Sequence, residues 1–185
     1  MSMAHLDGDT IRSALRLLGS CLASERDVEI LIVGGAAGVL TGELPGTWTT
    51  TDVDVIHCWP PQDREDVLAA AVEAGRRMRF PGSWLSEDVG LFVWTLPDNW
   101  TERRVLVGNF DRLRAYAAGR QDLIAMKFLA HRACDLEHLA AMNVTPAELD
   151  FVRRHLDTRI EAYPPEAGRI EMTRRYVNEW QQPRP

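Results

Sequence analysis

The sequence predicts an α/β fold, in which a small mixed sheet flanked by helices is followed by a helical C-terminal part. Two observations predict it. Short apolar segments near residues 28–33 and 51–58 have the β-branched composition of strands, and they alternate with segments of helical periodicity. From residue 121 onward the periodicity is helical throughout. With 185 residues, 45% of them hydrophobic, the chain can bury a sizeable core. We therefore expect one domain over residues 1–185, with a core of about 1–120 and a helical part of about 121–185.

The first third of the chain predicts a helix, a strand, a short helix and a second strand. Asp9 or Thr10 can cap a first helix whose apolar residues recur at helical spacing: Ile11, Leu15, Leu18 and Leu22. Residues 28–33 form a buried strand that ends at Gly34-Gly35. Residues 36–40 continue as a short helix and 41–50 as a loop. Residues 51–58 then alternate as a strand does.

The remaining elements are mostly helical. Pro60-Pro61 ends the second strand, and a helix with acidic first and basic last turns spans about 63–78. Residues 91–94 are a candidate strand, and 104–107 and 112–116 are predicted strands. One helix is expected over 121–142. The next begins at Thr145 with a capping box to Glu148, and a last helix spans about 168–180.

Composition excludes several classes of protein. A net charge of −6 and a pI near 5.4 argue against a general nucleic-acid binder. Apolar runs are too short to span a membrane, and Met1–Thr10 lacks the basic start of a secretory signal. The three cysteines form neither a disulfide framework nor a paired zinc motif. We expect a cytoplasmic protein without membrane contact.

Two acidic residues give the first functional hypothesis. Asp52 and Asp54 stand two apart on a predicted strand, so both carboxylates point to the same face. Mg²⁺ is commonly held by one or two carboxylates together with substrate phosphates. The alternative is a polar strand face exposed to water.

The preceding turn favours the metal hypothesis. A buried strand that ends in Gly34-Gly35 and opens a helix lets bare backbone amides approach a phosphate. A dinucleotide fingerprint is the competing interpretation, but residues 33–38 lack its spaced glycines. A strand, a glycine turn and an Asp-x-Asp pair together indicate a site that binds phosphate and a metal ion.

These residues resemble the signature of the nucleotidyltransferase superfamily: Val33-Gly34-Gly35, then Thr51-Asp52-Val53-Asp54-Val55. Residues 122–139 resemble a second motif found in AbiEii-like and minimal nucleotidyltransferases, in which a lysine-containing helix runs into an Arg-x-x-Asp-Leu segment. The resemblance implies a nucleotidyltransferase-like fold and Mg²⁺-dependent transfer of a nucleoside monophosphate from an NTP to a protein or tRNA acceptor. It also implies a place in a toxin–antitoxin or defence pair, with a cognate toxin or antitoxin as partner.

The resemblance also implies residue roles. Gly34 and Gly35 would cradle the phosphates, Asp52 and Asp54 would be catalytic and hold Mg²⁺, and Lys127 would neutralise triphosphate charge. Lys127 is the only lysine among 21 basic residues. On one continuous helix, Lys127, His131 and Asp135 would form a single stripe, so Asp135 joins the predicted nucleotide-binding set. We expect Lys127 to tolerate substitution with little effect on stability, as surface residues do.

The sequence departs from the family at two points. His138 stands where related proteins often have an aspartate, and a third carboxylate on a later strand has no clear equivalent. Asp111 precedes the predicted strand at 112–116. Within that strand, Arg112 and Arg114 occupy the positions where a third carboxylate would be useful. An alternative function is therefore a catalytically inactive nucleotidyltransferase-like binding module of the antitoxin type.

Overall fold

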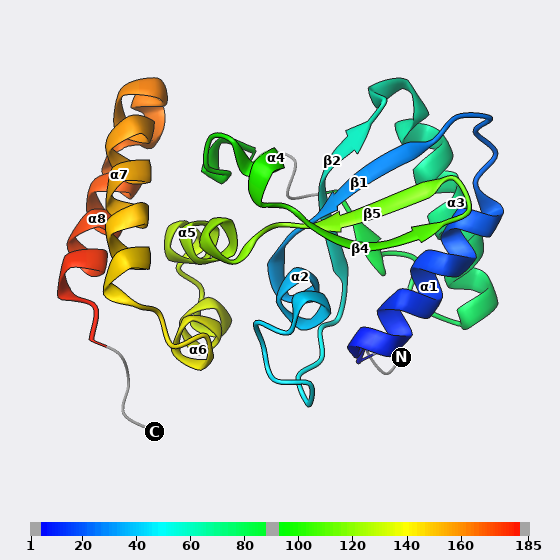
Figure 1. Ribbon diagram of the computed structural model, residues 1–185, viewed down its shortest axis with the longest axis horizontal. Helices are drawn as coiled ribbons and strands as arrows, with labels where there is room; N and C mark the ends of the chain where they lie inside the picture. The colour runs from blue at the N-terminus through cyan, green and yellow to red at the C-terminus, as the bar shows by residue number, and fades with distance from the viewer. Residues whose placement is uncertain (1–4, 88–92, 182–185) are drawn as a thin grey trace. The chain divides into compact units, whose positions relative to one another are not determined.

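A computed structural model describes residues 5–87 and 93–181. The chain forms two compact units. Unit 1 comprises residues 1–91 and 104–118, and unit 2 comprises residues 92–103 and 119–185. Unit 1 contains the sheet and unit 2 is helical (Figure 1). The predicted α/β class, with a mixed sheet, flanking helices and a helical C-terminal region, is confirmed.

Unit 1 is built around a five-stranded sheet with strand order β3-β2-β1-β5-β4. Strand β1 is antiparallel to β2 and parallel to β5, while β4 and β5 form an antiparallel hairpin. The short strand β3 runs parallel to β2. The elements of unit 1 in chain order are α1 (Gly8–Cys21), β1 (Val28–Ile32), α2 (Gly34–Thr41), β2 (Val53–Trp59), η1 (Pro61–Asp63), α3 (Arg64–Met78), β3 (Leu85–Ser86), β4 (Val105–Phe110) and β5 (Leu113–Ala117).

Central strand β1 explains why this sheet forms. Four of its five residues are buried, with Glu29 the exception, so its near-continuous apolar run matches a strand covered on both faces. Helices α1 and α3 pack against each other, and α1 also contacts β4 and β5 (Figure 1). Helix α1 buries Ile11, Leu15 and Leu18 of the predicted stripe, whereas Leu22 is the half-buried C-cap residue beyond the helix. Its N-cap is Asp7 rather than Asp9 or Thr10. The Asp7 carboxylate accepts a hydrogen bond of 2.8 Å from the Thr10 amide.

A β-bulge in β2 sets the direction of its side chains. Leu31 pairs with His57, yet the next residue, Ile32, pairs with Val55, so Ile56 is extra. Residues paired across strands share a face, which places Val55 on the face of Ile32. The bulge therefore allows Val53 and Val55 to be buried while Asp54 points to the opposite face.

Unit 2 is a set of helices, with one segment contributed from the middle of the chain. Its elements are α4 (Trp100–Arg103), α5 (Arg120–Ala130), α6 (Ala133–Ala141), α7 (Pro146–Ala162), η3 (Pro164–Glu166) and α8 (Ala167–Glu179). Helix α5 packs against α6, α7 and α8, and α7 packs along α8. The predicted capping box at the start of α7 is confirmed, because Thr145 and Glu148 bond reciprocally.

Ion pairs attach the segment before β4 to the helices of unit 2. Arg103 donates to Asp122, a fully buried residue of α5, from Nε at 3.0 Å and from an Nη at 2.6 Å. Arg159 of α7 donates to Asp98 at 2.6 Å. Asp122, which opens the second sequence motif, thus has a structural role in unit 2.

Two predicted elements differ from the structure. The single helix over 121–142 is wrong, because α5 ends at Ala130 and α6 begins at Ala133. His131 adopts left-handed backbone angles (φ 52°) that end α5, and extended Arg132 restarts the chain as the N-cap of α6. Of the candidate strand at 91–94, residues 91 and 92 lie outside the described residues, and 93–94 belong to a 3₁₀ turn.

Across residues 5–87 and 93–181, no helix combines the length and the apolar character that crossing a membrane requires.

Candidate functional site

The turn between β1 and α2 has the backbone that the sequence predicts for a phosphate cradle. Val33 is extended and caps α2, and Gly34 is the first helical residue. Gly34 has φ +68°, a conformation that favours glycine over other residues. Of the two glycines in this turn, only Gly34 has a positive φ. The turn therefore presents backbone amides at the start of α2, where the helix dipole favours anions.

Asp54 lies directly against this turn. The Val33 amide donates to the Asp54 carbonyl at 2.9 Å, which joins the end of β1 to the start of β2. The space that a Cβ on Gly34 would occupy is 2.7 Å from Oδ2 of Asp54. A side chain at position 34 would therefore shift the carboxylate, in addition to straining the backbone at its positive φ. The predicted glycine turn and one of the two predicted acids therefore lie side by side.

Asp52 stands just before β2, which begins at Val53. Like Asp54, it is half-buried. Thr50 donates through its hydroxyl to the Asp52 carbonyl at 3.1 Å and to Oδ1 at 3.4 Å. This contact restrains the approach to β2, because Thr50 is itself bonded through its backbone to Leu6.

The chemistry of these donors fits Mg²⁺. Asp54 lies beside the glycine turn, and Asp52 stands two residues before Asp54. Both are half-buried carboxylates, whose hard oxygens are ligands that Mg²⁺ takes together with substrate phosphates. Asp52 and Asp54 are the residues that would hold the ion.

A neighbour of Asp54 was missed by the sequence analysis. Ser86 of β3 pairs with Asp54 in register, so the two side chains share a face of the sheet. A strand of two residues has no hydrophobic period, and the sequence therefore carries no signal for it. The next residue, Glu87, forms an ion pair with Arg64 at 2.8 Å.

The strand after β4 carries basic rather than acidic residues. Asp111 occupies the β4–β5 turn with φ 53°, and Arg114 of β5 pairs with Asp27 at 2.7 Å and with Glu29 at 3.7 Å. The register places Arg114 opposite Glu29, on the face that also carries Trp59. Position 114 therefore holds a paired cation in unit 1.

Unit 2 brings the lysine of the second motif together with Asp135. The Lys127 ammonium is 3.4 Å from Oδ1 of Asp135 and 2.7 Å from Nδ1 of His138. Its side chain is only 3% exposed, so the expectation of a tolerant surface lysine is wrong. The contact with Asp135 arises because the break after α5 brings the first turn of α6 against Lys127, and not from one continuous helical stripe.

The charges of this cluster depend on one another. Burial lowers the pKa of Lys127, and the negative charge of Asp135 opposes that shift. Burial disfavours ionisation of Asp135, but hydrogen bonds from Arg132 and the charge of Lys127 outweigh it and lower its pKa. Burial, aided by the Lys127 charge, lowers the pKa of His138 to about 4. His138 is therefore neutral at pH 7, and its Nδ1 accepts from the ammonium, which only donates.

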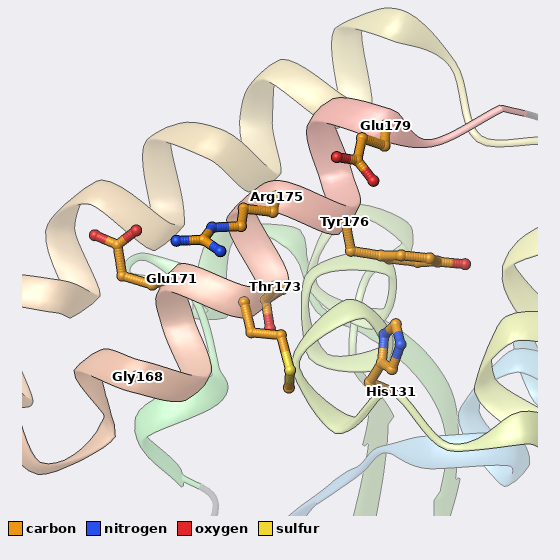
Figure 2. A pocket seen from close by; sticks show the side chains of 8 residues that line it. His131, Gly168, Glu171, Thr173, Arg175, Tyr176 and Glu179 are labelled. Atoms are coloured by element: carbon orange, nitrogen blue, oxygen red, sulfur yellow. The ribbon is translucent and has the colours of Figure 1, made fainter.

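His131 does not join this cluster. Its ring lies edge-on to Tyr176, with ring centres 4.3 Å apart. Together they line a groove of about 510 Å³ along α8, which Figure 2 shows with Thr173, Arg175 and Glu179 on the same helix. The predicted grouping of His131 with Lys127 and Asp135 is thus replaced by an aromatic contact with α8.

Comparison with known proteins identifies the family of the chain. Searches of curated proteins and of solved structures found no significant match. A family described as "Nucleotidyltransferase of unknown function (DUF6036)" matches residues 11–182, a span that contains the glycine turn, Asp52, Asp54 and the Lys127 cluster. The chain therefore belongs to this nucleotidyltransferase family.

Proposed function

We propose that the chain is a Mg²⁺-dependent nucleotidyltransferase that moves a nucleoside monophosphate from an NTP to a protein or RNA acceptor. The observation that carries the proposal is the contact between the positive-φ turn at Gly34 and the Asp54 carboxylate. An anion-binding backbone and a hard-cation ligand are thereby placed side by side, as a magnesium–triphosphate substrate requires.

In this proposal each residue has one task. The amides of Gly34 and Gly35 bind phosphate oxygens, because the α2 N-terminus favours negative charge. Asp52 and Asp54 hold the metal, which when bound supplies charge neutralisation to the triphosphate. The family resemblance also assigns Lys127 and Asp135 to nucleotide binding, and the two form a buried ion pair within unit 2.

The acceptor and the cellular setting rest on the sequence resemblance. The second motif, residues 122–139, resembles AbiEii-like proteins, and this supports a protein or tRNA acceptor and a partner of the toxin–antitoxin type. A cytoplasmic location belongs to the same proposal.

Two observations favour a second candidate function, an inactive nucleotidyltransferase-like binding module. Arg114 occupies a strand position where a further acid would be useful, and it is paired with Asp27 and Glu29. His138 occupies the position of a family acid and is engaged by Lys127. A binding module would retain nucleotide or partner affinity without transfer.

Thermal unfolding with Mg²⁺ and each of the four NTPs tests the nucleotide site. A ligand at 100 times its Kd adds about 2.7 kcal/mol to folded-state stability. We expect one or more NTPs to raise Tm in wild type only when Mg²⁺ is present, and to have no effect on Asp54→Asn. Wild-type Tm unchanged by any NTP with Mg²⁺ would reject a nucleotide site in this turn.

A further inference from the structure

The face of the unit 1 sheet that carries the Asp54 carboxylate also carries aromatic side chains. The bulge in β2 leaves Asp54 on the face opposite to Ile32. His57 pairs with Leu31, which also points away from the face of Ile32. Trp59 lies two residues further along β2 and points the same way as His57. The candidate metal ligand and two aromatic rings therefore lie along one strand, on one face.

Trp59 is the exposed end of this row of side chains. It is 56% exposed, although a large apolar side chain is normally buried. Its ring lies within 4° of parallel to the His57 ring, with ring centres 6.4 Å apart. An exposed flat ring of this kind offers a surface on which any nucleic-acid base can stack.

Arginines lie next to these rings on the neighbouring strands. Tyr116 of β5 pairs with Leu31 and so shares the face of His57. The Arg104 guanidinium lies 3.8 Å from the centre of the Tyr116 ring and donates to Glu29 at 2.8 Å. Rings and guanidinium groups thus form one surface within unit 1, called the aromatic–arginine face below: His57, Trp59, Arg104, Arg114 and Tyr116.

We propose that the aromatic–arginine face binds single-stranded RNA as the acceptor, with a base stacked on Trp59 and a phosphate bound by Arg114. This inference rests on the proposed function, which names RNA as one acceptor class. The Arg114 side chain is 45% exposed, and its guanidinium has the charge and the planar donors that suit a phosphate. Stacking does not depend on net charge, so a chain of net charge −6 can bind RNA in this way.

The position of Asp54 on the same face connects this surface to the reaction. Five residues separate Asp54 from Trp59, which corresponds to about 16 Å along a strand. An RNA strand that stacks on Trp59 and extends along β2 therefore brings one end to the acid that would hold Mg²⁺.

Fluorescence anisotropy with a labelled RNA of about 12 nucleotides tests the proposal. The same RNA as a duplex and a DNA strand of the same sequence serve as further probes. Wild type should bind the single strand about tenfold or more tightly than the duplex, because paired bases cannot stack on Trp59. Trp59→Ala should weaken binding of the single strand about tenfold or more, and Trp59→Phe much less. Arg114→Gln should make the slope of log K against log salt shallower by about 0.7, because one phosphate contact is lost.

Matched controls replace similar side chains on helix α3 of the same unit. Arg77 bonds Glu73 at 2.7 Å, as Arg114 bonds Asp27, and Arg77→Gln should leave the salt slope unchanged. Val72 is an exposed apolar residue, and Val72→Ala should leave the RNA affinity unchanged. All the replaced side chains are exposed, so the urea midpoint of each variant should stay close to that of wild type.

Three outcomes would overturn the inference: wild-type RNA affinity in Trp59→Ala, equal affinity of wild type for the duplex, or tighter binding of the DNA strand. If NTP with Mg²⁺ raises Tm but wild type binds no RNA, the inference fails alone and the proposed function keeps its protein acceptor. If no NTP raises Tm, the proposed function fails, and the acceptor role of the aromatic–arginine face fails with it, whatever its RNA affinity.

Discussion

Replacement of Gly34 by alanine separates the conformational requirement of the turn from its binding role. Gly34→Ala forces an L-residue into φ +68°, which costs about 1–2 kcal/mol. The new Cβ would also stand 2.7 Å from Oδ2 of Asp54, so the carboxylate must move away. With a urea m-value of about 2 kcal/mol/M, the unfolding midpoint should fall by about 0.5–1 M. Mg²⁺-dependent NTP binding should be lost, because the displaced acid no longer lies beside the turn.

Gly42→Ala is the matched control. Gly42 has φ +77° at the end of the same helix, and nothing lies within 4 Å of an added Cβ. It should therefore lose similar stability in urea while keeping wild-type NTP affinity in a binding titration. If Gly34→Ala also keeps wild-type affinity after a similar loss of stability, the turn does not bind the nucleotide.

Three further predictions concern single side chains. Asp52→Asn and Asp54→Asn should each abolish Mg²⁺-dependent NTP binding in calorimetry, with an urea midpoint close to wild type. Lys127→Met should reduce the free energy of unfolding by about 3 kcal/mol, because it breaks a buried ion pair, and an unchanged urea midpoint would contradict the burial. Burial and the Arg159 charge lower the pKa of His155 to about 4, against about 6.5 when unfolded. The unfolded chain thus binds the proton first, so stability should fall from pH 6.5 to 4, and less so in His155→Gln.

Local chemistry made much of unit 1 predictable. Residues 28–33 combine β-branched composition with a following glycine pair, and both the strand and the turn stand where those signals place them. The capping box at Thr145 in unit 2 was equally predictable, because it depends on two residues three positions apart. Signals of this kind act within one turn or one strand, where a sequence can be interpreted directly.

Long-range pairing explains what the sequence did not reveal. Nothing in residues 53–59 marks Ile56 as an extra residue, because the bulge exists only relative to β1. The helix breaks at His131 although the helical pattern of the sequence continues through residues 121–142. The break could not be predicted, because a histidine seldom adopts the left-handed backbone angles that end α5. The burial of Lys127 follows from that break. Ser86 lies beside Asp54 because of a pairing of only two residues between β2 and β3, which the sequence does not indicate.

The central claim is transfer of a nucleoside monophosphate, and the position of a radioactive label tests it most directly. Purified chain is incubated with Mg²⁺, total RNA or total protein, and each NTP labelled at either the α- or the γ-phosphate. We predict acceptor labelling from the α-phosphate alone, and none with Asp54→Asn. Labelling from the γ-phosphate would identify a different phosphoryl transfer, and NTP binding without any labelling would identify the inactive binding module instead.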